Sequence, residues 1–205
     1  MAMSVDLDRV IHALYEAALD PERWVSAFEL LGDALGGCAI GSSVQRSAGW
    51  MNFLTYARLD PHYMALMGQQ FYDVRTNEMV AVMSGLPAAV AVGRQAVKAD
   101  GAYFRSSLYN EILAPQGVAH AAVACAFRSP EYFVPLGIFR RTGQEEFGQR
   151  EHDILKLVLP PIAVWRDAAR CHRRHLQDEC RRAGDRRGER RLVGSTAKAA
   201  CRVFR

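Results

Sequence analysis

Five aromatic side chains and one histidine are the residues best suited to hold a small molecule. Tyrosine and tryptophan combine an apolar body with a polar tip, and pockets for small molecules are mostly apolar with a few polar groups. A neutral imidazole can both donate and accept a hydrogen bond. Ordinary packing in the core or at its rim is the alternative interpretation. The candidate ligand-binding residues are Trp50, Tyr56, Tyr72, Tyr103, Tyr109 and His120.

Motifs for covalent or phosphate chemistry are not evident in the sequence. It contains no Gly-x-Ser-x-Gly elbow, no phosphate-binding loop and no His-Glu-x-x-His pair. Ser42 and Ser43 follow a glycine, but no histidine lies nearby in sequence to act as a base. We therefore expect no catalytic residue, no cofactor and no enzymatic activity.

Two cysteines and two histidines lie close together near the C-terminus, at Cys171, His172, His175 and Cys180. Zinc accepts such ligands in a tetrahedral arrangement. The spacing matches no common zinc module, and the neighbouring arginines raise the cost of placing a dication there. We expect no metal site.

The composition is that of a globular protein, because half of the 205 residues are hydrophobic and 23% are charged. No apolar run reaches the length of a membrane span, and the first residues do not resemble a signal peptide. We expect a cytoplasmic protein with no membrane contact. Cys38 and Cys125 lie in apolar stretches and are expected to be buried thiols.

Two helices are predicted at the N-terminus. Apolar residues recur at helical spacing between residues 7 and 18, with Ser4 as the expected N-cap. Asp20 and Pro21 indicate the start of a second helix, and Gly36 its end. Further helices are predicted over residues 61–71, 76–83 and 100–113, and from Glu145 to Trp165, with a kink at Pro160 and Pro161.

Alternating or continuously apolar segments predict five strands. Turn residues at 47–49 and 129–131 connect two pairs of neighbouring strands, and short links of this kind imply an antiparallel sheet. We expect an α+β fold with helices on one face of the sheet and the terminal helices packed together. The strand ranges are residues 38–44, 50–57, 90–93, 118–128 and 132–141.

Three strings, in this order, resemble the bacterial helix-turn-helix regulators of the LuxR type. They run from Ile11 to Trp24, from Phe104 to Gly117, and from Phe139 to Pro161. The resemblance implies a GAF/PAS-like sensory domain over residues 1–168. Residues 71–76 lack the Asp-Pro that follows an aromatic pair in the acyl-homoserine lactone receptors, so the resemblance does not imply autoinducer binding.

The resemblance stops before the DNA-binding half of that family. Residues 149–158 resemble the first helix of a helix-turn-helix module, but Pro160 and Pro161 follow where that helix would continue. Residues 1–165 carry 13 basic and 17 acidic side chains, whereas residues 166–205 carry 13 basic and 5 acidic ones. We interpret residues 169–205 as a basic tail that is either disordered or the remnant of a shifted reading frame. DNA contact is expected only through a domain missing from this chain.

The function implied by the resemblance is a sensory and dimerisation domain that binds a small ligand and signals through its exit helix. A homodimer is expected, with Leu14, Trp24, Ile162 and Trp165 at the interface. The alternative is a stand-alone GAF/PAS-like module that acts by protein–protein contact through the first two helices and the last.

Overall fold

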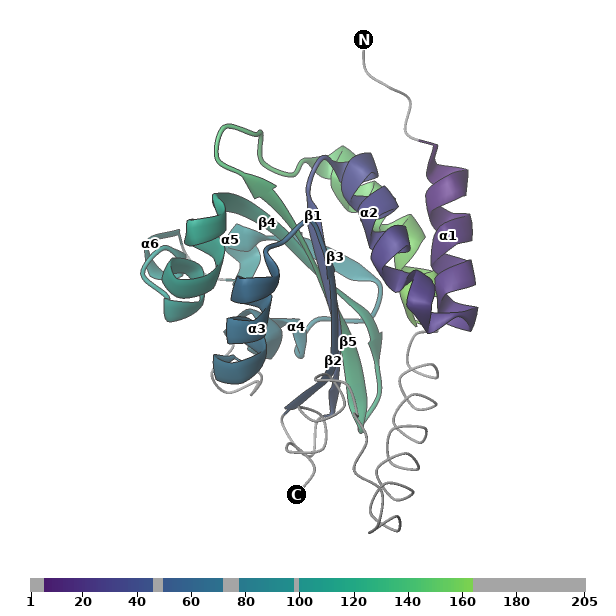
Figure 1. The fold of residues 1–205 in the computed structure, drawn as a ribbon, viewed down its shortest axis with the longest axis horizontal. Coiled ribbons are helices and arrows are strands. Elements are labelled where there is room, and N and C mark those ends of the chain that lie inside the picture. The colour runs from purple at the N-terminus through teal and green to yellow at the C-terminus, as the bar shows by residue number, and fades with distance from the viewer. Residues whose placement is uncertain (1–5, 46–49, 72–77, 98–99, 164–205) are drawn as a thin grey trace, which may run out of the picture.

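The fold is a three-layer arrangement with a five-stranded sheet between two groups of helices (Figure 1). The computed structural model describes residues 6–45, 50–71, 78–97 and 100–163. The expected hairpin turn at 47–49, Tyr72, Trp165 and the basic tail therefore lie outside the described residues.

The helices and strands alternate along the chain in an α+β order. The helices are α1 (Leu7–Leu19), α2 (Trp24–Leu35), α3 (Pro61–Gln70), α4 (Glu78–Met83), α5 (Arg94–Val97), α6 (Asp100–Tyr103) and a C-terminal helix at 149–163. A π-helical turn, η2, spans Leu108–Leu113, and short 3₁₀ turns span Pro21–Arg23 and Ala114–Gln116. The strands are β1 (Cys38–Gln45), β2 (Trp50–Ala57), β3 (Val90–Gly93), β4 (Val118–Arg128) and β5 (Tyr132–Arg141).

The sheet has the strand order β2-β1-β5-β4-β3, and all neighbouring strands are antiparallel. Two hairpins, β1–β2 and β4–β5, meet where β1 pairs with β5, so that Cys38 lies opposite Phe139. The predicted antiparallel sheet of five strands is confirmed. The short strand at 90–93 is the edge strand beside β4.

Local capping residues fix where the first helices begin and end. Asp6, rather than the predicted Ser4, caps α1 by accepting a hydrogen bond from the backbone N–H of Arg9. Asp20 caps the 3₁₀ turn that leads into α2. Gly36 ends α2 in the left-handed conformation, with a φ of 67°, as the Gly-Gly pair predicts.

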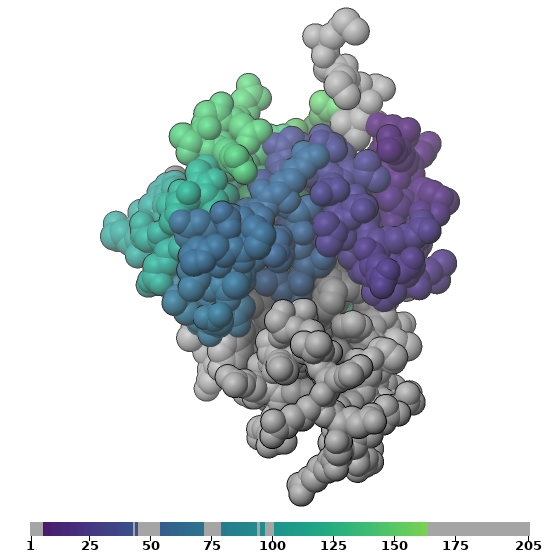
Figure 2. Space-filling model, in the orientation of Figure 1, coloured from purple at the N-terminus to yellow at the C-terminus, as the bar shows by residue number. Residues whose placement is uncertain are grey.

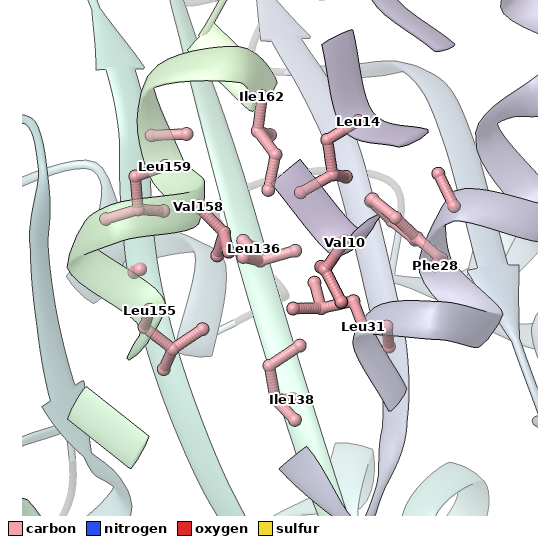
Figure 3. Close-up of a cluster of buried hydrophobic side chains, with 14 of the residues drawn as sticks. Val10, Leu14, Phe28, Leu31, Leu136, Ile138, Leu155, Val158, Leu159 and Ile162 are labelled. Atoms are coloured by element: carbon pink, nitrogen blue, oxygen red, sulfur yellow. The ribbon is translucent and has the colours of Figure 1, made fainter. Parts of the chain in front are cut away.

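One face of the sheet is covered by the two ends of the chain. Figure 3 shows Ile162 of the C-terminal helix beside Leu14 of α1, and Leu136 of β5 between Leu155 and the N-terminal helices. The predicted packing of the terminal helices against each other is confirmed. This first hydrophobic cluster also takes in α2, with Phe28 and Leu31, and the small residues Ala39, Ala57, Ala122, Ala124 and Ala126 of the sheet.

The second face of the sheet is covered as well, which corrects the expectation of helices on one face only. Side chains of β1, β4 and β5 alternate between the two faces because successive strand residues point to opposite sides. The second cluster therefore includes Val123 and Phe139, next in sequence to residues of the first. α3, α4 and η2 close this face with Met64, Met67, Met83, Leu108 and Ile112.

The single helix predicted over residues 100–113 is wrong, because the structure divides this segment into α6 and η2. The carbonyl of Tyr103 accepts hydrogen bonds from both the backbone N–H and the hydroxyl of Ser106, at 3.0 and 2.7 Å. The amide of Asn110 donates to the carbonyls of Phe104 and Ser106, both at 3.0 Å. Side chains of this kind compete with regular helical bonding, so α6 ends at Tyr103 and the chain resumes as the π-helical turn η2.

The C-terminal helix starts later than predicted, at residue 149 instead of Glu145. Glu151 accepts a hydrogen bond from the backbone N–H of Gly148 at 2.8 Å, which is half of a capping box. The helix continues through Pro160 and Pro161 to residue 163, where the described part ends. The carbonyls that lose their donors belong to residues 156 and 157, whose side chains are exposed on the solvent side.

Candidate functional site

A cavity lies between the second face of the sheet and the helical elements α3, α4 and η2. It contains about 430 Å³ of empty space, counting the part that is open to solvent. Among the described lining residues, Ser42 is the one polar side chain, and it is buried. The lining is formed by Ile40, Ser42, Met67, Met79, Val80, Met83, Leu108, Leu113, Val123, Pro135, Gly137 and Phe139.

The floor of the cavity is made by strand residues that leave room above the sheet. Ile40 and Ser42 are two apart on β1 and therefore share a face. Gly137 of β5 has no side chain, and a Cβ atom there would come within 2.8 Å of the ring of Phe139. The Phe139 ring thus lies over Gly137, and a larger residue at 137 would displace it.

Three methionines form much of the opposite wall. Met67 of α3 and Met79 and Met83 of α4 are each at most 7% exposed. Methionine is unbranched and polarisable, so it fills irregular gaps and adjusts to different neighbours. A wall of this kind can reshape around an apolar guest without opening the fold.

An aromatic cluster adjoins η2, the turn that supplies Leu108 and Leu113. The rings of Tyr103, Phe104 and Tyr109 lie with their centroids 4.9–5.3 Å apart, in tilted or edge-to-face contact. Such contacts favour fixed orientations of the rings. π-helical turns occur often at functional sites because they place side chains that a regular helix would not.

The three predicted ligand-binding tyrosines that the structure describes belong to this second cluster. Tyr103 is buried, whereas Tyr56 and Tyr109 are half-buried against it. Tyr56 is the register partner of Ile40, and Tyr109 follows Leu108, so both adjoin lining residues. Trp50 lies in β2, with a side chain outside the described set, as is the whole of Tyr72.

His120 lies on the other side of the sheet from the cavity. It pairs with Arg140 in the β4–β5 ladder, two residues from the Ala122–Ile138 pair of the first cluster. Its Nδ1 is 3.4 Å from the carboxylate of Glu146. The structure therefore separates His120 from the tyrosines with which sequence analysis grouped it.

The residues that sequence analysis missed are the cavity lining itself. The sequence contained a local signal for some of these lining residues but not for others. Pro135 and Gly137 are small or shape-restricted residues inside an otherwise bulky strand, which suggests a close approach or a space above it. The methionines on α3 and α4 are separated in sequence, and only the fold brings them together.

The predicted dimer-interface residues that the structure describes are buried within the protomer. Leu14, Trp24 and Ile162 are each 0% exposed and belong to the first hydrophobic cluster of the protomer. A partner chain could reach them only if this core opened. The same helical periodicity marks an intramolecular and an intermolecular face, so sequence spacing could not separate the two.

Within the described ranges, no group of three or more histidine, cysteine, aspartate or glutamate side chains could hold a metal ion. Over the same ranges, no helix has the length and hydropathy needed to span a membrane. Cys38 and Cys125 are buried thiols, as predicted.

Comparison with solved structures identifies the architecture. The chain is similar to VqsR LBD domain from Pseudomonas aeruginosa, with a TM-score of 0.59 and 14% identity over 80% of this chain and 96% of that one. The fold is that of LuxR-family ligand-binding domains. The LuxR-type fold is also seen in CepR2 from Burkholderia cenocepacia, an N-acylhomoserine lactone-dependent regulator, with a TM-score of 0.53 and 15% identity over 80% and 94% of the two chains.

A third similar structure is SdiA of Escherichia coli, with a TM-score of 0.50 and 8% identity over 80% of this chain and 67% of that one. Comparison of the sequence with protein-family models and with curated proteins finds no match. The LuxR-type fold is therefore shared in the arrangement of elements, at sequence identities of 8–15%.

Proposed function

We propose that this chain is the sensory domain of a LuxR-type transcriptional regulator and binds a small, largely apolar ligand. The observation that carries the proposal is the cavity between the sheet and α3, α4 and η2, with its apolar lining and methionine wall. The fold supports it, because LuxR-family ligand-binding domains have the same architecture. Binding and signalling, rather than catalysis, is the function that such a lining favours.

Signalling in this proposal runs through the C-terminal helix. The ligand shifts the packing of that helix, and with it the geometry of a homodimer. DNA is reached through a domain outside this chain. The proposed sensory domain covers residues 1–168, with residues 169–205 as a separate tail.

Titration with N-phenyl-1-naphthylamine, an uncharged apolar fluorophore, tests the cavity directly. Saturable binding is expected. Leu108→Phe, which adds bulk at a lining residue only 6% exposed, is expected to weaken it by about tenfold or more. The matched control is Leu19→Phe on α1, because Leu19 is 87% exposed. Equal binding by both variants, or no saturable binding, would contradict a ligand site in this cavity.

Contact with another protein is a second candidate function, favoured by the positions of exposed apolar side chains. Tyr15, Leu19, Val25 and Leu157 are exposed and lie on α1, α2 and the C-terminal helix. Figure 2 shows α1 and α2 as a continuous purple surface on one side of the molecule. We propose a second copy of this chain as the partner.

Sedimentation analysis of the whole chain tests this second candidate. A concentration-dependent dimer is expected, and Leu19→Glu is expected to shift it to monomer because a charge replaces an apolar contact. Gln69→Glu adds the same charge at an exposed position of α3 and is expected to leave the dimer intact. A monomer at all concentrations, or equal effects of both variants, would exclude this surface as the dimer interface.

A further inference from the structure

Arg140, at the end of β5, has every one of its guanidinium donors bonded. A guanidinium carries five N–H groups. Nε and Nη2 donate to the carbonyl of Leu35 at 3.0 and 2.8 Å. Nη1 donates to the carbonyls of Glu145 and Glu146, both at 3.2 Å, and Nη2 also donates to Glu151 Oε1 at 3.3 Å. The Arg140 side chain is only 13% exposed, so these bonds lie largely out of water.

These five bonds join three parts of the fold. Leu35 is the last residue of α2, and its carbonyl has no acceptor role left within the helix. Glu151 lies in the first turn of the C-terminal helix and accepts from the backbone N–H of Gly148 with its other oxygen. The guanidinium also lies over the ring of Phe147, 4.4 Å from its centroid. Arg140 therefore fixes the end of α2 and the start of the C-terminal helix to β5.

The residue before Arg140 faces the cavity. Phe139 lines it, with its ring over Gly137, while Arg140 points to the opposite face. The backbone of Phe139 lies close against Gly37, the second residue after α2. A Cβ atom at Gly37 would collide with the Phe139 carbonyl oxygen, so the strand has little room to move toward α2. A guest that displaces the Phe139 ring therefore either presses the β5 backbone against Gly37 or rotates the ring within the cavity wall.

We propose that Arg140 is the positioning residue that couples occupancy of the cavity to docking of the C-terminal helix. The inference rests on the proposed function, since it assigns a regulatory role to that same cavity. Displacement at Phe139 changes the position of the adjacent guanidinium. Its bond to Glu151 passes the change to the helix, because Glu151, of the partners above, lies within 149–163. Packed cores respond in this way because they rearrange between discrete arrangements rather than deform smoothly.

Hydrogen exchange measured with and without N-phenyl-1-naphthylamine tests the coupling on the full chain. In the natural sequence, the probe is expected to slow exchange in α3 and η2, which line the cavity, and by about fivefold in residues 149–163. Arg140→Lys keeps the charge but offers only three donors from a single point. It is expected to keep the response of α3 and η2 and to lose most of the response in 149–163.

Arg141→Gln is the matched control, because Arg141 is the next residue along the strand and is exposed. It is expected to respond as the natural sequence does. If Arg140→Lys does not fold, Glu151→Ala serves instead, since it cuts the link between Arg140 and the helix but keeps the four bonds to backbone carbonyls. The ratio of exchange rates with and without probe is compared, so a uniformly looser helix does not imitate lost coupling.

Three outcomes overturn the proposal, and they differ from one another. If α3 and η2 respond but 149–163 does not respond in the natural sequence, the helix is not coupled to the cavity. If 149–163 responds equally in Arg140→Lys, or in Glu151→Ala where that variant stands in, coupling does not use this residue. If no cavity segment responds in any variant, the proposed ligand site itself fails, and this inference fails with it.

Discussion

At the scale of single residues, the fold favours the ionised form of the Glu151 carboxyl group. Burial opposes ionisation of its carboxyl group. The backbone N–H of Gly148, the N–H of Glu151 itself and the guanidinium of Arg140 outweigh that effect and lower the pKa of Glu151 from its ordinary 4.5. Since the charged form is favoured more in the folded than in the unfolded chain, ionisation of Glu151 contributes to stability.

The pH dependence of unfolding follows from the sign of this shift. A lowered folded pKa gives a contribution that is complete above pH 4.5 and is lost as the pH falls through the folded value. Glu151→Gln is expected to flatten the fall in the free energy of unfolding over this acid range. Urea unfolding at a series of pH values measures the slope. An unchanged slope in the variant would show that the carboxylate is not held in this way.

At the scale of elements, the junction between α2 and β1 decides how the helical layer meets the sheet. Gly36 takes a positive φ, which L side chains seldom adopt, and Gly37 lies against the carbonyl of Phe139. The two glycines serve different purposes, because the first reverses the chain and the second permits close approach to β5. Gln144 completes the junction by donating to the carbonyl of Gly36 at 2.7 Å.

A pair of glycine substitutions tests this account of the junction. Gly37→Ala is expected to lower the free energy of unfolding by about 1–3 kcal/mol, because the backbone of β5 must shift to admit a methyl group. Gly68→Ala is the matched control in α3, where nothing lies within 4 Å of the added Cβ. It is expected to stabilise by about 0.5–1 kcal/mol through lower chain entropy. Similar values from urea unfolding for both variants would contradict the close approach.

At the scale of the whole molecule, the C-terminal helix is an integral part of the domain. Leu155, Val158, Leu159 and Ile162 are each 0% exposed and share one cluster with α1, α2 and the sheet (Figure 3). The chain thus returns from its last strand to cover the face that its first two helices began to cover. A signal transmitted by this helix must therefore change how the helix packs on the core, rather than detach it from the domain.

Two leucines on this helix test how far it contributes to the core. Leu155→Ala is expected to cost about 2–5 kcal/mol because it opens a cavity at a fully buried site. Leu157→Ala removes the same atoms at a position that is 55% exposed and is expected to change stability by less than about 0.5 kcal/mol. Equal and small losses in thermal or urea unfolding would mean that the helix is only loosely attached.

Local signals were sufficient for most of the secondary structure. Gly36 ended α2 as predicted, and Asp20 and Pro21 began the 3₁₀ turn that leads into α2, because capping and left-handed turns depend on a few neighbouring residues. The strands at 118–128 and 132–141 matched their predicted limits. The helix at 100–113 did not, because Ser106 and Asn110 form side-chain bonds to the backbone that periodicity does not register.

The sequence by itself thus determined the strands, the positions of most helices and the presence of two amphipathic terminal helices, all of which follow from short-range spacing. Only the tertiary structure decided what those faces meet. Leu14 of α1 and Ile162 of the C-terminal helix belong to one hydrophobic cluster within a single chain. His120 and Tyr56 lie on opposite sides of the sheet. The cavity belongs to no segment, because its walls come from strands and helices far apart in sequence, and contacts of that range carry no local pattern.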